Sequence, residues 1–302
     1  MLDSFARVDP GLVAVALVFH LANMGLRSVA WRNVLRAAYP DRPVPLLGIA
    51  GAYLAGVAIN SFTPGRGGDL AKIALARTRI RHSSVPTIAA SIGVVSLFDT
   101  VIGGLVILTL AVSGVLPAPP GLPSLPAAPT LLTDHLVVTL AAGAVLAIAA
   151  VLLARRFSWR LAEVWRKLKD GAAILHTPRR WATEVAALQL AAWSCRIGAA
   201  FFLLGAFGIP ATIPAAVTVV VVGGLSTVVP TPGGAGAQQV LLAYMLQTTA
   251  STAVVVSFSL GMQAAVTVLN VSIGLAAVML MLRTLRPHRA LRTHLRAARA
   301  EA

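Results

Sequence analysis

Long apolar stretches alternate with short polar segments along the chain. Five of them reach or exceed the roughly 20 residues that a helix needs to cross a bilayer. They cover residues 11–31, 84–115, 131–154, 182–207 and 250–282. Only helices and closed barrels satisfy their backbone hydrogen bonds inside lipid, and stretches of this length fit helices. The pattern therefore predicts an all-α polytopic membrane protein.

Two further apolar stretches, 44–62 and 212–229, run into segments rich in proline and glycine, at residues 63–68 and 230–236. Proline removes a helix donor and glycine frees the backbone, so we expect each helix to stop there. Two interpretations are open. Each break is the tip of a helix-break-helix hairpin that enters and leaves on one side of the membrane, or each is an ordinary loop in a chain of eight helices.

The positions of the basic residues favour the hairpins. Of the 25 Lys and Arg residues, 23 fall in four blocks, at 27–42, 66–81, 155–180 and 283–299. Basic loops stay in the cytoplasm, so all four blocks should lie on that side. A simple crossing by 44–62 would put block 66–81 outside. We therefore predict about five full spans and two re-entrant hairpins in the cytoplasmic membrane, with a cytoplasmic C-terminus.

The two breaks also mark an internal repeat. Pro64-Gly65 and Pro232-Gly233 lie 168 residues apart, and the same shift carries the first two spans onto later ones. Residues 11–115 then form a first repeat and 182–283 a second one. The odd connecting span 131–154 makes the second repeat inverted, within a single membrane domain of residues 1–302. Broken helices at matching places of inverted repeats are typical of a transporter site near the bilayer midplane.

Composition excludes several classes of protein. Apolar residues make up 57% of the chain and charged residues 12%, too few charges for the polar shell of a soluble protein of this size. A single cysteine excludes disulfide scaffolds and thiolate metal clusters, and the six histidines lack metal-ligand spacing. We expect no metal, no cofactor and, since the net charge of +15 follows the loops, no nucleic-acid partner.

Two basic segments are expected at the inner membrane surface. The cytoplasmic segment 155–180 begins with a basic amphipathic pattern, and the tail 284–302 carries arginines at helical steps. Such segments contact anionic inner-leaflet lipids or serve only as anchors that set topology. Residues 1–10 carry a net charge of −1 and no signal-peptide pattern, which predicts an external start.

Ionisable residues at membrane depth are costly, so each is a candidate for function. These candidates are Arg66, Asp69, Lys72, Asp99 and Arg196. We expect Asp99 to pair with Arg66, Lys72 or Arg196, either in a structural ion pair or as part of a ligand contact. On a helix that begins near Gly68, Asp69 and Lys72 share a face, and the amide donors point at the break, where a phosphate could be held. The residues predicted to bind substrate are Asn60, Pro64, Gly65, Arg66, Gly68, Asp69, Lys72, Asp99, Arg196, Pro232, Gly233, Gly234, Gly236, Gln238 and Gln239.

The strings at residues 60–72 and 229–239 resemble the transmembrane, flippase-like region of the lysylphosphatidylglycerol synthase (multiple peptide resistance factor) family. The similarity spans most of the chain and includes Asp99. It departs from the family pattern at Asp69 for glutamate, Lys72 for arginine, Ser96 for arginine and Gln239 for glutamate. The last change removes the obvious partner for a cationic aminoacyl headgroup. About 20 residues follow the last span, so we expect no soluble aminoacyl-transfer domain.

The resemblance implies that the protein moves a phospholipid or lipid-linked headgroup between leaflets. No phosphate-binding loop for ATP is present in the sequence. One alternative is a membrane-embedded transferase with a lipid-phosphate donor, in which Asp69 is the only well-placed base. Another is an accessory subunit in lipid or cell-envelope biosynthesis. The expected protein partner is a second copy of the chain, in a homo-oligomer, or a biosynthetic partner enzyme.

Overall fold

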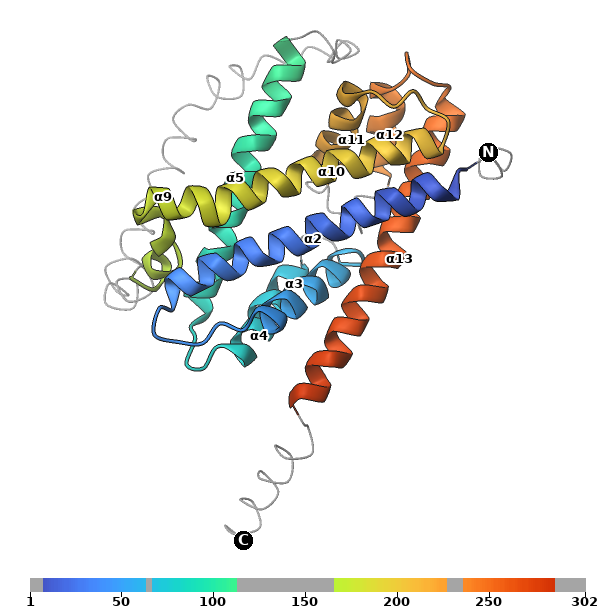
Figure 1. The fold of residues 1–302 in the computed structure, drawn as a ribbon. Coiled ribbons are helices and arrows are strands. Elements are labelled where there is room, and N and C mark those ends of the chain that lie inside the picture. Colours follow the sequence, from blue (N-terminus) through green and yellow to red (C-terminus); the bar gives the residue numbers. More distant parts are fainter. Residues whose placement is uncertain (1–7, 64–66, 113–165, 227–235, 286–302) are drawn as a thin grey trace, which may run out of the picture.

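A computed structural model describes residues 8–63, 67–112, 166–226 and 236–285 of the chain. Within these ranges every regular element is a helix and there is no strand (Figure 1). The predicted all-α class is confirmed. The connecting span 131–154 and most of the tail 284–302 lie outside the described residues, and of the amphipathic segment 155–170 only the last residues, from 166 on, are described and helical.

The first half of the described chain has four helices, α2 (Pro10–Ala38), α3 (Leu46–Asn60), α4 (Gly67–Arg79) and α5 (Val85–Val112). The first of them begins at Pro10 because Asp9 caps it. The Asp9 carboxylate accepts the backbone N–H groups of Gly11 (2.8 Å) and Leu12 (3.2 Å), and proline fits the first helical position. The predicted apolar stretches 44–62 and 84–115 correspond to α3 and α5.

The second half repeats this order. A short helix α9 (Pro178–Trp181) continues through a π-helical turn, η3 (Ala182–Ala186), into α10 (Ala187–Ala206). Two shorter helices follow, α11 (Ile213–Ser226) and α12 (Ala237–Met245), and the long α13 (Thr252–Leu285) comes last. A 3-10 turn, η2 (Ala173–His176), precedes α9.

Four of the described helices are long and apolar enough to cross a membrane. They cover Pro10–Ala38, Val85–Thr109, Pro178–Ala206 and Thr252–Met281. These helices match four of the five predicted spans. By contrast, α3 and α11 have only 15 and 14 residues, and each leads through a break into another short helix, which fits the two arms of a hairpin.

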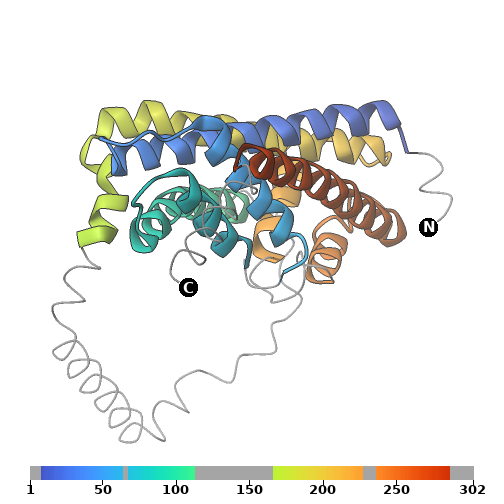
Figure 2. The same ribbon diagram turned by 90° about the horizontal axis from the view of Figure 1, so that it is seen from below.

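Helices α2 and α10 lie side by side and antiparallel. The backbone N–H of Asp9 donates to the carbonyl of Ala206 at one end (3.0 Å), and the Asn33 amide donates to the carbonyl of Glu184 at the other (2.9 Å). Figure 2 shows the two helices as one layer, with α3, α4, α5, α11, α12 and α13 on one side of it.

The same kinds of helix pair occur in both halves. α3 packs against α4 and α13, and α11 packs against α12 and α5. Likewise α2 contacts α3 and α5, while α10 contacts α11 and α13. An inverted repeat would produce such pairs, together with the antiparallel first helices. The repeat itself stays a prediction that this pattern supports.

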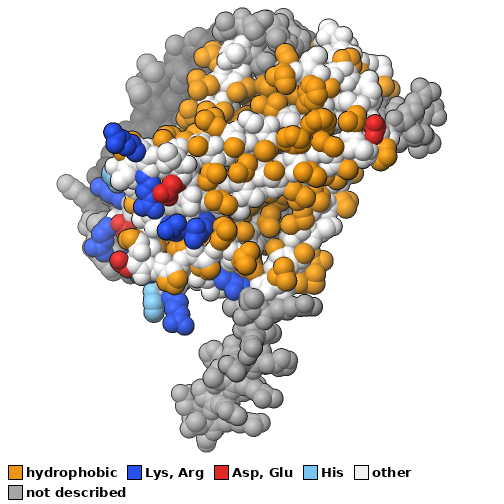
Figure 3. Space-filling view, viewed as in Figure 1, with side chains coloured by type: hydrophobic (Ala, Val, Ile, Leu, Met, Phe, Trp, Pro, Cys, Tyr) orange, Lys and Arg blue, Asp and Glu red, His pale blue; other side chains and the backbone are white. Residues whose placement is uncertain are grey.

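The outer surface is largely apolar. Large side chains such as Val18, Leu108 and Val268 are 60 to 66% exposed, well away from the polar end of the molecule. Figure 3 shows apolar side chains over most of one face and the basic side chains gathered at one end. Soluble monomers rarely expose apolar patches of this extent, whereas a membrane protein turns them toward lipid.

Candidate functional site

The first hairpin is formed by the close approach of α3 and α4. A Cβ atom on Gly68 would lie 2.0 Å from the carbonyl oxygen of Gly56, so only glycine lets the two backbones come this near. The Gly68 N–H donates to the side-chain oxygen of Asn60 (2.7 Å), which closes the tip. At the far end Arg79 lies against Gly48, so α4 returns to the level at which α3 begins. Pro64, Gly65 and Arg66 lie between the helices, outside the described residues.

Two charged residues of α4 face the hairpin interior. The Lys72 ammonium donates to the Asp69 carboxylate over 2.8 Å, which confirms the predicted shared face. The same ammonium lies 4.8 Å from the centre of the Tyr53 ring on α3, in a cation–π contact. Lys72 is 9% exposed, so its charge is held within the protein by these two neighbours.

Asp99 has a partner that the sequence pattern did not indicate. Both carboxylate oxygens accept hydrogen bonds from the Arg27 guanidinium, one of them over 3.1 Å. The indole N–H of Trp193 donates to the same carboxylate, also over 3.1 Å. Among the described residues Asp99 thus pairs with Arg27 and not, as expected, with Lys72 or Arg196, while Arg66 lies outside them. Arg27 lies well inside the membrane-spanning helix α2, within the predicted span 11–31, although it also opens the basic block 27–42.

Tyr53 joins the two ion pairs. Its hydroxyl oxygen accepts a hydrogen bond from the Arg27 guanidinium (2.9 Å), while its ring carries the Lys72 ammonium. The result is one continuous set of contacts, which we call the charged array. It consists of Asp69 and Lys72 on α4, Tyr53 on α3, Arg27 on α2, Asp99 on α5 and Trp193 on α10.

The sequence did contain a signal for part of this array. Arg27 is followed by Ser28, Val29, Ala30 and Trp31, so the apolar pattern of α2 continues beyond the charge. An arginine within such a helix needs a counter-ion, and this reasoning could have selected Arg27. Tyr53 and Trp193 could not have been selected, because aromatic residues are common on membrane helices and nothing local distinguishes these two.

Arg196 lies one helical turn after Trp193 and faces the second hairpin. Its guanidinium is 5.7 Å from the Trp193 ring and donates to the carbonyl of Val220 on α11 (3.5 Å). A Cβ atom on Gly223 would lie 3.9 Å from this guanidinium and 4.0 Å from the amide nitrogen of Gln238. The structure therefore brings Arg196 and Gln238 together on either side of Gly223.

Gln239 fastens the start of α12 to α13. Its side-chain oxygen accepts the backbone N–H of Gly236 (2.6 Å), and its side-chain nitrogen donates to the oxygen of Gln263 on α13 (2.7 Å). Gly236 has a φ of 84°, a left-handed conformation that suits glycine. Pro232, Gly233 and Gly234 lie outside the described residues.

A polar link also ties the first hairpin to α13 and α2. The Asn270 amide donates to the hydroxyl of Ser61 (3.5 Å), and the Asn270 oxygen lies 2.9 Å from a ring nitrogen of His20. Asn270 is 7% exposed. Ser61 directly follows α3, so the end of this helix has polar contacts both to Gly68, through Asn60, and to Asn270, through Ser61.

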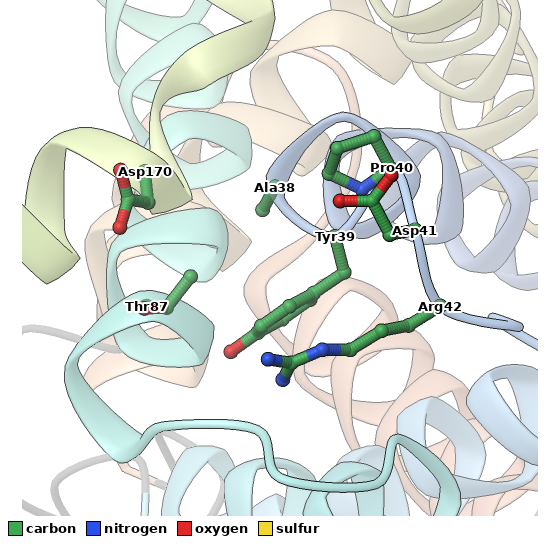
Figure 4. A pocket seen from close by; sticks show the side chains of 7 residues that line it. All are labelled: Ala38, Tyr39, Pro40, Asp41, Arg42, Thr87 and Asp170. Atoms are coloured by element: carbon green, nitrogen blue, oxygen red, sulfur yellow. The ribbon is translucent and has the colours of Figure 1, made fainter.

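Two hollows lie apart from the predicted residues. One, of about 170 Å³, is at the basic end between Tyr39, Asp41, Arg42, Thr87 and Asp170 (Figure 4). There the Arg42 guanidinium stacks 5.2 Å from the Tyr39 ring and donates to two backbone carbonyls, those of Arg81 and His82. The other, of about 360 Å³, is apolar and lies between α2, α10 and α13. Within the part of the chain that the structure describes, no group of three or more His, Cys, Asp or Glu side chains forms a metal site.

Comparison with known protein families gives a match. The family described as the lysylphosphatidylglycerol synthase TM region matches residues 1–296, nearly the whole chain. No curated protein and no solved structure matches.

Proposed function

The chain belongs to the family of the lysylphosphatidylglycerol synthase TM region, and from this premise we propose that it translocates a phospholipid or lipid-linked headgroup across the cytoplasmic membrane. The observation that carries the proposal is the charged array. It places two ion pairs among helices whose outer faces are apolar, where charges without a function are disfavoured.

The headgroup phosphate is proposed to bind at the tip of the first hairpin. The first turn of α4 directs backbone N–H groups toward the break, that of Gly68 being bonded to Asn60, and the helix dipole adds partial positive charge there. Arg66 precedes this turn in the sequence and Lys72 lies within its second turn. Phosphate binding at helix N-termini relies on this combination of donors and dipole. The acyl tails would stay in lipid along the apolar outer surface (Figure 3).

The path is proposed to run between the two hairpins. The return of α4 to the level of the start of α3 supports a hairpin that enters and leaves on one side. That side is the end where basic side chains gather, which the positive-inside rule would place in the cytoplasm. Arg196 and Gln238 at the second hairpin would receive the headgroup from the opposite side.

The transferase alternative has less support. A general base must accept a proton from the reacting group, and Asp69 is the carboxylate that the sequence offered for this task. In the structure the Asp69 carboxylate accepts a hydrogen bond from the Lys72 ammonium at 2.8 Å, so a reacting group would have to compete with Lys72 for it.

The experiment is a headgroup-accessibility assay with purified protein in liposomes. Fluorescent phospholipids in the outer leaflet are quenched chemically, and the wild type should expose inner-leaflet lipid as well. Arg66→Ala should abolish this exchange, because it removes a charge from the proposed phosphate site. Arg77→Ala is the matched control, since Arg77 lies exposed at the far end of α4. No exchange of any lipid by the wild type would overturn the proposal, and unchanged exchange by Arg66→Ala would remove the phosphate role.

A further inference from the structure

We infer that the headgroup is a net anionic phosphate without an ammonium group, and that the protein selects against cationic aminoacyl headgroups. This inference rests on the proposed function and adds the class of substrate. It follows from which charges of the transport region are available to a ligand.

Carboxylates are the groups that would recognise an ammonium, and few lie near the hairpins. The chain has 10 acidic residues, and none of them falls in the breaks 64–66 and 227–235. Of those described, Asp9 caps one end of α2, while Asp41, Asp170 and Glu184 lie at the basic end with the loops. Asp69 and Asp99 are the two that the structure places among the described membrane helices.

Both of these carboxylates are already engaged. Asp69 accepts from Lys72, and Asp99 accepts from Arg27 and from Trp193. An incoming ammonium would have to displace Lys72 or Arg27. The displaced cation would then stay buried without its counter-ion, which is strongly unfavourable. A cationic headgroup therefore gains little from either site.

The charges of the described membrane helices favour an anion. Besides the two ion pairs Arg27–Asp99 and Lys72–Asp69, these helices carry Arg196 between the Trp193 ring and the carbonyl of Val220, so cations outnumber carboxylates there. The first turn of α4 adds the positive end of a helix dipole. A region of net positive charge with apolar walls attracts anions and repels cations.

The second hairpin contributes no opposing charge. Gln239 is an amide whose oxygen accepts from Gly236 and whose nitrogen donates to Gln263, so it serves to hold α12 against α13. Gln239→Glu would keep the acceptor for Gly236, remove the donor to Gln263 and add one negative charge at the start of α12, next to Gln238. This variant tests the inference by changing the charge with almost no change in shape.

The experiment compares three lipids with identical fluorescent tails in the liposome assay. Their headgroups are phosphatidylglycerol (anionic), phosphatidylethanolamine (neutral overall) and lysylphosphatidylglycerol (cationic). We expect the wild type to move the anionic lipid at least ~10-fold faster than the cationic one, as charge selection of this kind predicts. Gln239→Glu should reduce that ratio severalfold. Gln247→Glu is the matched control, because Gln247 lies exposed in the turn after α12 and the same charge there should leave the ratio unchanged.

The outcomes separate the two claims. Equal rates for the anionic and cationic lipids, or a faster cationic lipid, overturn the inference and leave translocation standing. If no lipid moves, translocation is refuted, and binding of the same three lipids to the protein in detergent micelles decides the headgroup class. Tighter binding of phosphatidylglycerol then supports the inference, and equal or weaker binding overturns it. If Gln239→Glu does not fold, the ratio of the wild-type rates for the anionic and cationic lipids decides the headgroup class.

Discussion

Gly68→Ala should open the first hairpin. A Cβ atom at this position would lie 2.0 Å from the Gly56 carbonyl oxygen and 2.7 Å from the side chain of Asn60. Carbon and other heavy atoms pack at about 3.5 Å or more, so α3 and α4 would have to separate by roughly 1.5 Å. The nearest atom belongs to the backbone of a helix, so no side-chain rotation can relieve the clash.

The free energy of unfolding should fall by about 2–4 kcal/mol. Overpacking in a tight core typically costs about 1–3 kcal/mol. Separating the helices also stretches the hydrogen bond from the Gly68 N–H to Asn60, now 2.7 Å long, and such a bond contributes about 1 kcal/mol. The two losses occur together, because both depend on the same separation of α3 and α4.

The measurement is equilibrium unfolding in mixed micelles, followed by circular dichroism. Gly104→Ala is the matched control, because Gly104 lies within α5 and nothing stands within 4 Å of a Cβ atom built there. Alanine is the better helix former by about 1 kcal/mol, so this control should be neutral or slightly stabilising. Equal free energies of unfolding for the two variants would refute the close approach of α3 and α4.

Three further predictions concern other contacts and use the same unfolding measurement. Arg27→Gln and Asp99→Asn should each lower the free energy of unfolding by about 2–3 kcal/mol, because each leaves the other residue as a largely buried charge without its partner. The double variant should recover most of this loss, and additive losses would contradict the pairing. Asp9→Ala should cost about 1 kcal/mol through loss of the N-cap of α2, and a neutral result would show that the cap is not formed. Gln189→Met should change the free energy of unfolding by less than about 1.5 kcal/mol. Gln189 is fully buried, its amide donates to the carbonyl of Val95, and its oxygen has no partner among the described residues. A much larger loss would show that the hydrogen bond to Val95 contributes more to stability than this reasoning allows.

The membrane-spanning helices could be predicted from the sequence because the thickness of the bilayer sets the length of the apolar stretch that crosses it. The stretch predicted at 250–282 became Thr252–Leu285, and the one at 84–115 became Val85–Val112. The first span was predicted too short. It was expected to end at residue 31, yet α2 continues to Ala38, and Arg32 donates to the carbonyl of Val44 (3.0 Å). Long basic side chains can extend to polar partners while their helix continues, so a charge does not mark the end of a span.

The site was predictable only where its contacts are local. Asp69 and Lys72 are three residues apart on one helix, and helical geometry alone brings them together. Arg27 and Asp99 are 72 residues apart, on helices whose relative placement no hydropathy pattern determines. Several candidates selected for substrate binding also have internal contacts, such as Asn60 with Gly68 and Gln239 with Gln263. A sequence does not reveal whether a polar side chain faces a ligand or its own backbone.

The contacts of the charged array also determine what must break if the first hairpin moves. Arg27, Asp99 and Trp193 belong to long helices, whereas Tyr53, Asp69 and Lys72 belong to the first hairpin. Within the array the two groups meet at one hydrogen bond, from Arg27 to the hydroxyl of Tyr53. If the hairpin swings away from α2 and α5, that bond is the only part of the array that must break, and both ion pairs stay whole. A small movement of the first hairpin can therefore break the hydrogen bond between Arg27 and Tyr53 without separating opposite charges in the membrane.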